Sequence, residues 1–430
     1  MREQELIIYR NIEDDKILKD MVWLMENYEK EEIDYSETRA LCYGLIHSFL
    51  EMAGHYGFSG NLWHCYLTHM LVNNENSYSK SCEIRGQIEG TVNKAVLHDI
   101  TIMKEFFDYD FEAMMDKLQV PDFELVLDYQ ASIQESKVYN SRIRDRICTL
   151  AKALSCSATT EQMKDTLTQF YGEYGVGKFG LHKAFRVERT DKGVEIVPIL
   201  NIAHVHLDDL VGYEIPKKKL IDNTEAFVYG RKANNCLLFG DAGTGKSSSI
   251  KAIANQYYND GLRIIEIYKH QFQDLNDVIS QIKNRNYKFI IYMDDLSFEE
   301  FEIEYKYLKA VIEGGLEKKP KNVLIYATSN RRHLVREKFS DKEERRDDLH
   351  ASDTVQEKLS LVSRFGVTIF FCAPDKKEFG NIVKTLAARH HISMPEEELL
   401  LEANKWELAH GGLSGRTAQQ FIDYILGLQN

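Results

Sequence analysis

The chain of 430 residues has no excess of positive charge, no paired cysteine motif and no long apolar run. Its formal net charge is -13, so no positive field covers the whole molecule, which disfavours a dedicated nucleic-acid binder. The seven cysteines are scattered and include no C-x-x-C pair. We therefore interpret them as reduced thiols that are mostly buried.

The longest apolar runs, residues 289–293 and 365–373, are too short to cross a bilayer, so no membrane span is expected. The first residues lack the charged-then-apolar order of a signal peptide, which predicts a cytoplasmic protein. We find no internal repeat and no low-complexity tract. Hydrophobic residues make up 43% of the chain and charged residues 28%, which is a globular composition with room for two or three domains.

The spacing of apolar residues changes along the chain. Residues 1–170 show the apolar spacing of helices, as in Ile17, Met21 and Leu24. Residues 171–206 are interpreted as a β-hairpin connector. In residues 207–373, short apolar strands at 236–239, 263–268, 288–293, 322–328 and 366–371 alternate with helical stretches, which predicts a parallel α/β sheet. Residues 374–430 are helical throughout, as in a lid.

A phosphate-binding loop follows the first of these strands. Its eight residues match the pattern G-x-x-x-x-G-K-[ST] in full: Gly240-Asp241-Ala242-Gly243-Thr244-Gly245-Lys246-Ser247. The glycines let backbone N–H groups converge on phosphate oxygens, Lys246 supplies a positive charge, and the Ser247 hydroxyl is a Mg²⁺ ligand. The helix expected from Ser248 points its positive end at the same anion. The sequence therefore predicts an ATP–Mg²⁺ site.

Polar residues end the neighbouring strands. Asp294 and Asp295 follow the strand 288–293, where Asp294 is expected to hold the metal and Asp295 to activate the attacking water. Glu299 or Glu300 could serve as the base instead. Asn330 follows the strand 322–328 and is a candidate to reach between the water and the γ-phosphate.

With these residues in place, residues 205–430 resemble the AAA+ ATPases. The resemblance implies that residues 207–212 pack near the adenine and that Asn330 is the first sensor. Ser363-Arg364-Phe365-Gly366 is similar to the arginine-finger box, which implies that Arg364 reaches the γ-phosphate of a neighbouring subunit. Gly412-Leu413-Ser414-Gly415-Arg416 is similar to the second sensor, which implies that Arg416 contacts phosphate from the lid.

The strand ends 294–298 and 327–334 resemble more closely a bacterial family of AAA+ ATPases with no assigned role. The Asp294-Asp295 pair is similar to that of the initiator and helicase-loader branch, whereas many AAA+ motors carry Asp-Glu. Because aspartate is one methylene shorter than glutamate, slow turnover would be in keeping with this pair.

The fold class expected is an α/β P-loop NTPase of the AAA+ type with a C-terminal helical lid, preceded by a mostly helical domain. The leading function is an ATPase that assembles into a ring or partial ring, with a hexamer favoured, and that remodels or loads an unknown protein client. One alternative is a slowly hydrolysing, nucleotide-gated binding switch or scaffold. Another is a DNA-acting loader, so a nucleic-acid partner is open but not favoured.

Overall fold

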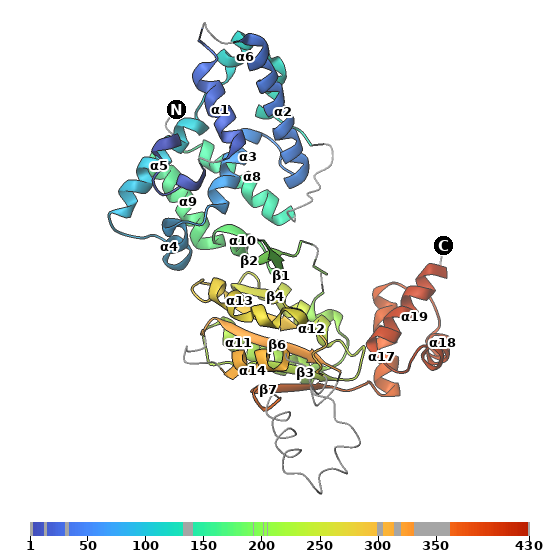
Figure 1. Cartoon of the computed structure of the whole chain (residues 1–430). Helices are drawn as coiled ribbons and strands as arrows, with labels where there is room; N and C mark the ends of the chain where they lie inside the picture. Colours follow the sequence, from blue (N-terminus) through green and yellow to red (C-terminus); the bar gives the residue numbers. More distant parts are fainter. Residues whose placement is uncertain are drawn as a thin grey trace. The chain divides into compact units, whose positions relative to one another are not determined.

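The computed structural model describes residues 3–428 except 13–14, 31–33, 132–140, 192, 201, 204, 299–303, 314–319 and 331–361. The chain divides into two compact units, Met1–His182 and Lys183–Asn430 (Figure 1). Each unit has its own core, and each is described by itself below.

The first unit is helical in the part of it that the structure describes. One core of apolar side chains joins its helices, and α3 is buried on most of its surface, because apolar residues occur all round it. The helices are α1 (Lys16–Asn27), α2 (Tyr35–Tyr56), α3 (Leu62–Asn73), α4 (Ser77–Arg85), α5 (Val92–Phe107), α6 (Glu112–Leu118), α7 (Glu124–Leu127), α8 (Ser141–Ser155), α9 (Thr160–Tyr174) and α10 (Gly177–Leu181).

The second unit is built on a seven-stranded sheet with the order β2-β1-β4-β5-β6-β3-β7. Its pairings are parallel except for the β1–β2 hairpin. Five strands match the apolar runs expected from the sequence: β3 (Cys236–Gly240), β4 (Leu262–Glu266), β5 (Lys288–Met293), β6 (Val323–Ser329) and β7 (Val367–Phe371). β3 pairs with β6 on one side and with β7 on the other, so its carboxyl end is flanked by the carboxyl ends of these two strands.

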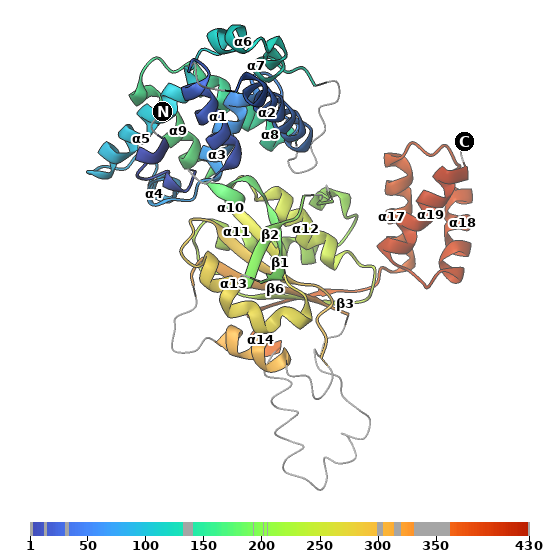
Figure 2. The ribbon, with the colours of Figure 1, turned by 45° about the horizontal axis from the view of Figure 1, so that its top comes forward.

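Helices lie on both faces of the sheet (Figures 1 and 2). One core joins α11 (Glu214–Val228) and α12 (Lys246–Gln256) to alternate residues of the strands, such as Ile290 and Tyr326. α13 (Leu275–Ile282) and α14 (Glu304–Glu313) contact each other and do not contribute to that core. Central strands such as β6 are buried at every residue, which explains why they read as continuous apolar runs.

The hairpin and the division of the chain differ from the expectation. β1 (Ala184–Thr190) and β2 (Gly193–Pro198) form the predicted hairpin, but β1 also pairs in parallel with β4. The hairpin is therefore the edge of the sheet and not a connector between domains. The boundary consequently falls between His182 and Lys183, earlier than the predicted one near residue 207.

Three helices after β7 form the lid: α17 (Lys376–Arg389), α18 (Glu396–Ala409) and α19 (Gly415–Leu428). They pack side by side around a small apolar core of their own (Figure 1). The expected fold class is thus confirmed: a mostly parallel sheet with a phosphate loop and a helical lid, preceded by a helical unit. In the described part of the chain, no helix is long and apolar enough to span a membrane.

Candidate active site

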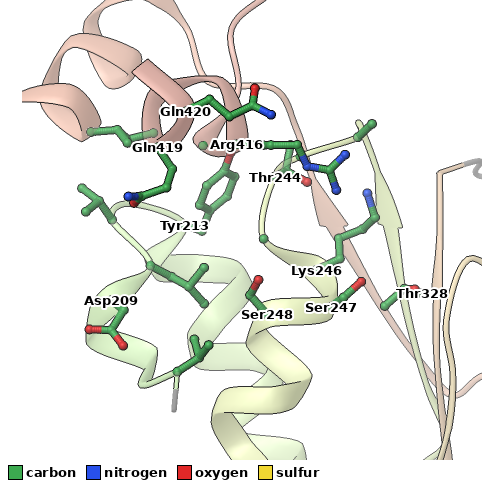
Figure 3. A pocket seen from close by; sticks show the side chains of 18 of the residues that line it. Asp209, Tyr213, Thr244, Lys246, Ser247, Ser248, Thr328, Arg416, Gln419 and Gln420 are labelled. Carbon is green, nitrogen blue, oxygen red and sulfur yellow. The ribbon is translucent and has the colours of Figure 1, made fainter. Parts of the chain in front are cut away.

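A cavity of about 690 Å³ lies in the second unit, between the carboxyl ends of the strands and the lid (Figure 3). Its floor is the loop between β3 and α12, residues 242–248. Ligands of open parallel sheets bind outside the carboxyl ends of the strands, which is where this cavity opens. Because β5 and β6 end at the same edge, Asp294, Asp295 and Asn330 reach it too.

The glycines of the loop are required by close approach of other backbone and side-chain atoms. Gly240 has a φ of 136°, and a Cβ there would lie 2.0 Å from the carbonyl oxygen of Phe371. Gly243 has a φ of 75°, and a Cβ there would lie 2.9 Å from the Ser414 hydroxyl of the lid. Only glycine therefore lets the loop run beside β7 and beneath the lid.

Lys246 lies at the start of α12 and is buried. Its ammonium group donates hydrogen bonds to the carbonyl oxygens of Gly240, at 2.9 Å, and Asp241, at 2.6 Å. Desolvation lowers the pKa of Lys246, and the carboxylates of Asp241, Asp295 and Asp294 oppose that shift. The loop thus holds one concentrated positive charge, together with the positive end of an eleven-residue helix.

Asp294 is held by two hydroxyl groups at the mouth of the loop. The Ser247 hydroxyl donates to its Oδ1 at 2.7 Å, and the Thr328 hydroxyl donates to the same atom at 2.5 Å. Burial alone would raise the pKa of Asp294, but the hydrogen bonds from Thr328 and Ser247 leave it below its usual value. A carboxylate and a serine hydroxyl side by side are oxygen ligands of the kind that Mg²⁺ prefers, so these two residues fit that ion.

Asp295 is fixed by residues at the end of β6. Its backbone N–H donates to the Thr328 hydroxyl at 2.9 Å, and its Oδ1 accepts from the Asn330 side-chain amide at 2.9 Å. Its φ of 49° lies in the left-handed region, which aspartate tolerates better than most residues. Because of this turn, the two carboxylates point to different partners: that of Asp294 bonds to Ser247, and that of Asp295 bonds to Asn330.

The other end of the cavity is largely apolar. It is lined from the segment before α11 and from the lid helix α17, by Leu210, Val211, Tyr213, Ile382 and Leu386. This end has the character of a site for a flat, partly apolar group such as a nucleobase. The glutamine side chains of α19 that also line the cavity, Gln419 and Gln420, offer both donors and acceptors (Figure 3).

Within the described residues, hydrogen bonds join the lid to the phosphate loop and to the segment before α11. The backbone N–H of Arg416, in the first turn of α19, donates to the carbonyl oxygen of Gly243 at 3.2 Å. At the end of α17, the Arg389 guanidinium donates to the carbonyl oxygens of Asp209, at 2.9 Å, and Asp208, at 2.5 Å. The Arg416 side chain lines the cavity near Lys246 and Thr244 (Figure 3).

The structure brings most of the predicted residues together around this cavity. Its lining includes residues 242–248, Asp294, Asp295, Asn330 and Arg416. Gly240 and Asp241 do not line it; the Asp241 carboxylate instead accepts from the backbone N–H of Ala373 at 2.8 Å. The alternative bases Glu299 and Glu300 lie outside the described residues.

Arg364 does not line the cavity of its own chain. It precedes β7, whose first residue, Val367, pairs with Cys236 at the start of β3. Arg364 therefore lies at the amino ends of the strands, whereas the phosphate loop lies at their carboxyl ends.

Two groups of site residues were missed from the sequence. Thr328 was noted only as a strand end, although a hydroxyl in register beside Asp294 was a usable signal. Ile382 and Leu386 carried no signal, because their four-residue spacing is that of any helix with an apolar face.

A protein-family model matches most of the second unit. The family model described as "Protein of unknown function (DUF815)" matches residues 180–429, more than half of the chain. These bounds nearly coincide with the second compact unit. Among curated proteins, the replication factor C large subunit of Methanococcus vannielii is 38% identical over 76 residues, which are 18% of this chain and 15% of that protein.

Solved structures of AAA+ proteins are distantly similar. RuvB of Thermotoga maritima, as a P216G mutant, has 17% identity and a TM-score of 0.34, covering 50% of this chain and 62% of that one. The AAA domain of FIGL-1 in complex with ADP has 15% identity and the same TM-score of 0.34, covering 51% and 74%. Likenesses this distant say nothing about substrates or partners.

Proposed function

We propose, from the membership of this chain in the AAA+ family described as "Protein of unknown function (DUF815)", that its second unit binds ATP with Mg²⁺. It would hydrolyse the bond between the β- and γ-phosphates at contacts between subunits. The hydrolysis would remodel or load a client macromolecule, most simply a protein. One observation carries this proposal: the Ser247 hydroxyl and the Asp294 carboxylate lie 2.7 Å apart at the mouth of a complete phosphate loop.

Binding of the triphosphate would use the loop and its lysine. The Lys246 ammonium now bonds to loop carbonyl oxygens, so phosphate oxygens would replace these as its partners. Ser247 and Asp294 would hold Mg²⁺, which supplies neutralisation of the charge on the phosphates. The apolar end lined by Leu210 and Leu386 would hold the base.

Hydrolysis would use the pair of Asp295 and Asn330. The Oδ1 atom of Asp295 accepts a hydrogen bond from the Asn330 amide. We assign the other carboxylate oxygen of Asp295, Oδ2, to orient the attacking water and take its proton. The Asn330 amide, bonded to the other side of that carboxylate, would keep it in place and touch the γ-phosphate. Arg416 would bring a permanent charge from the lid.

Arg364 supports action between subunits. Since it lies at the opposite edge of the sheet from its own cavity, it can reach a γ-phosphate only in a second copy of the chain. We propose that Arg364 completes the site of a neighbour, which makes the active form a homo-oligomer, with a hexameric ring as the favoured form. Arginine fingers of this kind contribute about 10³-fold or more to phosphoryl transfer.

The test is ATP hydrolysis measured against protein concentration, for the wild type and for Arg364→Ala. We expect activity per subunit to rise with concentration, and the variant to lose about 10³-fold in kcat while it still binds ATP. Lys321→Ala is the matched control, because Lys321 is an exposed cation just before β6 at the same edge of the sheet. Activity that is independent of concentration and of Arg364 would refute the shared site.

A second candidate function is a nucleotide-gated binding switch that hydrolyses ATP very slowly. The observation in its favour is the shorter side chain of Asp295, held on a left-handed turn and bonded to Asn330. A base restrained in this way and one methylene shorter than glutamate is less able to follow the water. Single-turnover hydrolysis measured beside ATP affinity separates the two, because the switch requires tight binding with turnover near the uncatalysed rate.

A further inference from the structure

Two cysteines from distant parts of the sequence meet in the first unit. Cys65 lies in the first turn of α3 and is buried, whereas Cys148 lies in the middle of α8 and is partly exposed. The helices α3 and α8 pack against each other, and the two thiols lie close enough to interact. Both also contact the backbone of Ser59, whose carbonyl oxygen lies 3.8 Å from the Cys65 sulfur.

The surroundings of Cys148 are positively charged along one face of α8. Arg144 precedes it by four residues and Lys152 follows it by four, so both lie on the same side of the helix as the thiol. Asp145, the other charged group that faces Cys148, is bonded to Arg144 at 2.7 Å. The interaction with Cys65 lowers the pKa of Cys148 against the effect of burial, with smaller contributions from the Ser59 backbone and Arg144, whereas the interaction with Cys148 and burial raise the pKa of Cys65.

We propose that Cys65 and Cys148 form a redox-sensitive dithiol, in which a hydroperoxide oxidises the accessible Cys148 and the buried Cys65 then closes a disulfide between α3 and α8. Partial exposure lets the small oxidant reach Cys148, and the contact between the thiols places the second sulfur next to the first. Among the described cysteines, these two alone combine mutual contact with an accessible member flanked by cations.

The chemistry balances with one equivalent of hydroperoxide. The Cys148 thiolate attacks a peroxide oxygen, so that an S–O bond forms, the O–O bond breaks, and the leaving hydroxide takes a proton to become water. The Cys65 thiol then loses its proton and attacks the sulfenic sulfur of Cys148. The S–S bond forms, and the S–O bond breaks with release of a second water. Two thiols are oxidised by two electrons, and for hydrogen peroxide the products are a disulfide and two waters.

The alternative is that the thiols simply pack, as small apolar side chains at a helix contact. That alternative predicts that oxidation starts at the exposed cysteines, Cys156 and Cys372, since access alone would then decide. The two accounts differ in which cysteine reacts first and in what its first product becomes.

The experiment treats the reduced full-length protein with hydrogen peroxide at pH 7, alkylates it at intervals and identifies the oxidised peptides by mass spectrometry. We expect the linked Cys65–Cys148 peptide to form at least about tenfold faster than oxidation at Cys156, because a larger fraction of Cys148 is thiolate. Dithiothreitol should restore both thiols. In Cys65→Ser, Cys148 should remain as a sulfenic acid that dimedone traps, and Cys156→Ser should leave the linkage intact.

The wild-type measurement decides the matter even if a variant folds poorly. If Cys156 or Cys372 is oxidised before Cys148, or if the peroxide yields no Cys65–Cys148 linkage, the dithiol proposal is wrong. Absence of a dimedone adduct on Cys148 in a folded Cys65→Ser protein would overturn the proposed order of steps. None of these readouts depends on ATP hydrolysis, so they fail or succeed independently of the function proposed for the second unit.

Discussion

The two units of this protein differ in how charge and chemistry are distributed between them. Residues 1–182 contain 18 Lys and Arg and 30 Asp and Glu, which leaves 36 and 37 for residues 183–430. The formal net charge of -13 therefore divides into -12 for the first unit and -1 for the second. The unit with the phosphate loop is close to neutral, and the acidic character belongs almost wholly to the helical unit.

This difference changes what the overall charge implies. The total of -13 disfavours nucleic acid as a partner of the first unit, but it says little about the second. It also separates two kinds of function. The second unit places two cationic side chains, Lys246 and Arg416, in one cavity, which suits an anionic ligand. The first unit offers an acidic surface and a thiol pair, and no group of three His, Cys, Asp or Glu residues that could hold a metal was found among the described residues.

The largest effect that would test this division is expected from Lys246→Ala. Loss of the ammonium group should lower kcat/KM for ATP by about 10³-fold or more, since it removes the charge nearest the β- and γ-phosphates. Lys251→Ala, an exposed lysine on the same helix, is the matched control. Unfolding of the first unit, followed separately by limited proteolysis, should be unchanged. A first unit destabilised by Lys246→Ala would mean that the two units are coupled.

The sequence predicted the parts of the second unit that are local. The strands β3, β5 and β6 that end at the cavity are buried apolar runs that lead directly to Gly240, Asp294 and Asn330, and the loop after β3 has the glycine and lysine spacing of a phosphate-binding loop. It did not predict where the hairpin goes, because the pairing of Ala184 with Ile264 depends on a contact between segments that are far apart along the chain. Local patterning specifies a strand but not its neighbour.

The same limit applies to the first unit. Its helices follow from apolar periodicity, but the meeting of Cys65 with Cys148 depends on how α3 and α8 pack. Arg389 was missed for a related reason: its partners are backbone carbonyl oxygens, which carry no residue identity for a pattern to detect. Sequence reasoning thus identified side chains that act through a motif and missed those that act through a long-range contact.

A mutation in the first unit tests the division from the other side. Asp99 is fully buried, and its carboxylate accepts the backbone N–H groups of Ile7, Ile8 and Tyr9 at 2.6 to 3.1 Å. Asp99→Ala would leave these three donors without an acceptor, which should lower the free energy of unfolding of the first unit by about 3 kcal/mol.

The measurement is urea unfolding of the full chain in a Trp406→Phe background, followed by the fluorescence of Trp23 and Trp63 in the first unit, with ATP hydrolysis assayed in parallel. Asp108→Ala, an exposed carboxylate paired with Lys104 at the end of the same helix, should change stability by less than about 1 kcal/mol. We expect hydrolysis to be retained in both variants. Loss of hydrolysis in Asp99→Ala at urea concentrations where the second unit is folded would contradict independent units.

A smaller effect is expected from Thr328→Val within the second unit. The change keeps the shape but removes the donor to Asp294 and the acceptor for the Asp295 N–H. Because that hydrogen bond holds the pKa of Asp294 below its usual value, its loss should raise this pKa and shift the acid limb of the pH–rate profile to higher pH. We expect kcat to fall by about tenfold to 10²-fold, with a higher requirement for Mg²⁺. An unmoved acid limb would show that Thr328 does not control Asp294.

The smallest effect is expected from Arg389→Ala. This variant tests whether the lid contributes to ATP binding through general apolar packing, like the helices of the first unit, or through a specific contact. Arg389 joins α17 to the segment that lines the apolar end of the cavity, so its removal should let Ile382 and Leu386 move away from the base. We expect affinity for ATP to fall by about fivefold to tenfold, with kcat nearly unchanged, as two charge-assisted hydrogen bonds at an exposed site allow. Inorganic triphosphate supplies the control within the experiment, because it has no base and its affinity should not depend on Arg389. Equal losses for ATP and for triphosphate would mean that Arg389 acts on the phosphate end, and that the lid is held chiefly by Arg416 at Gly243.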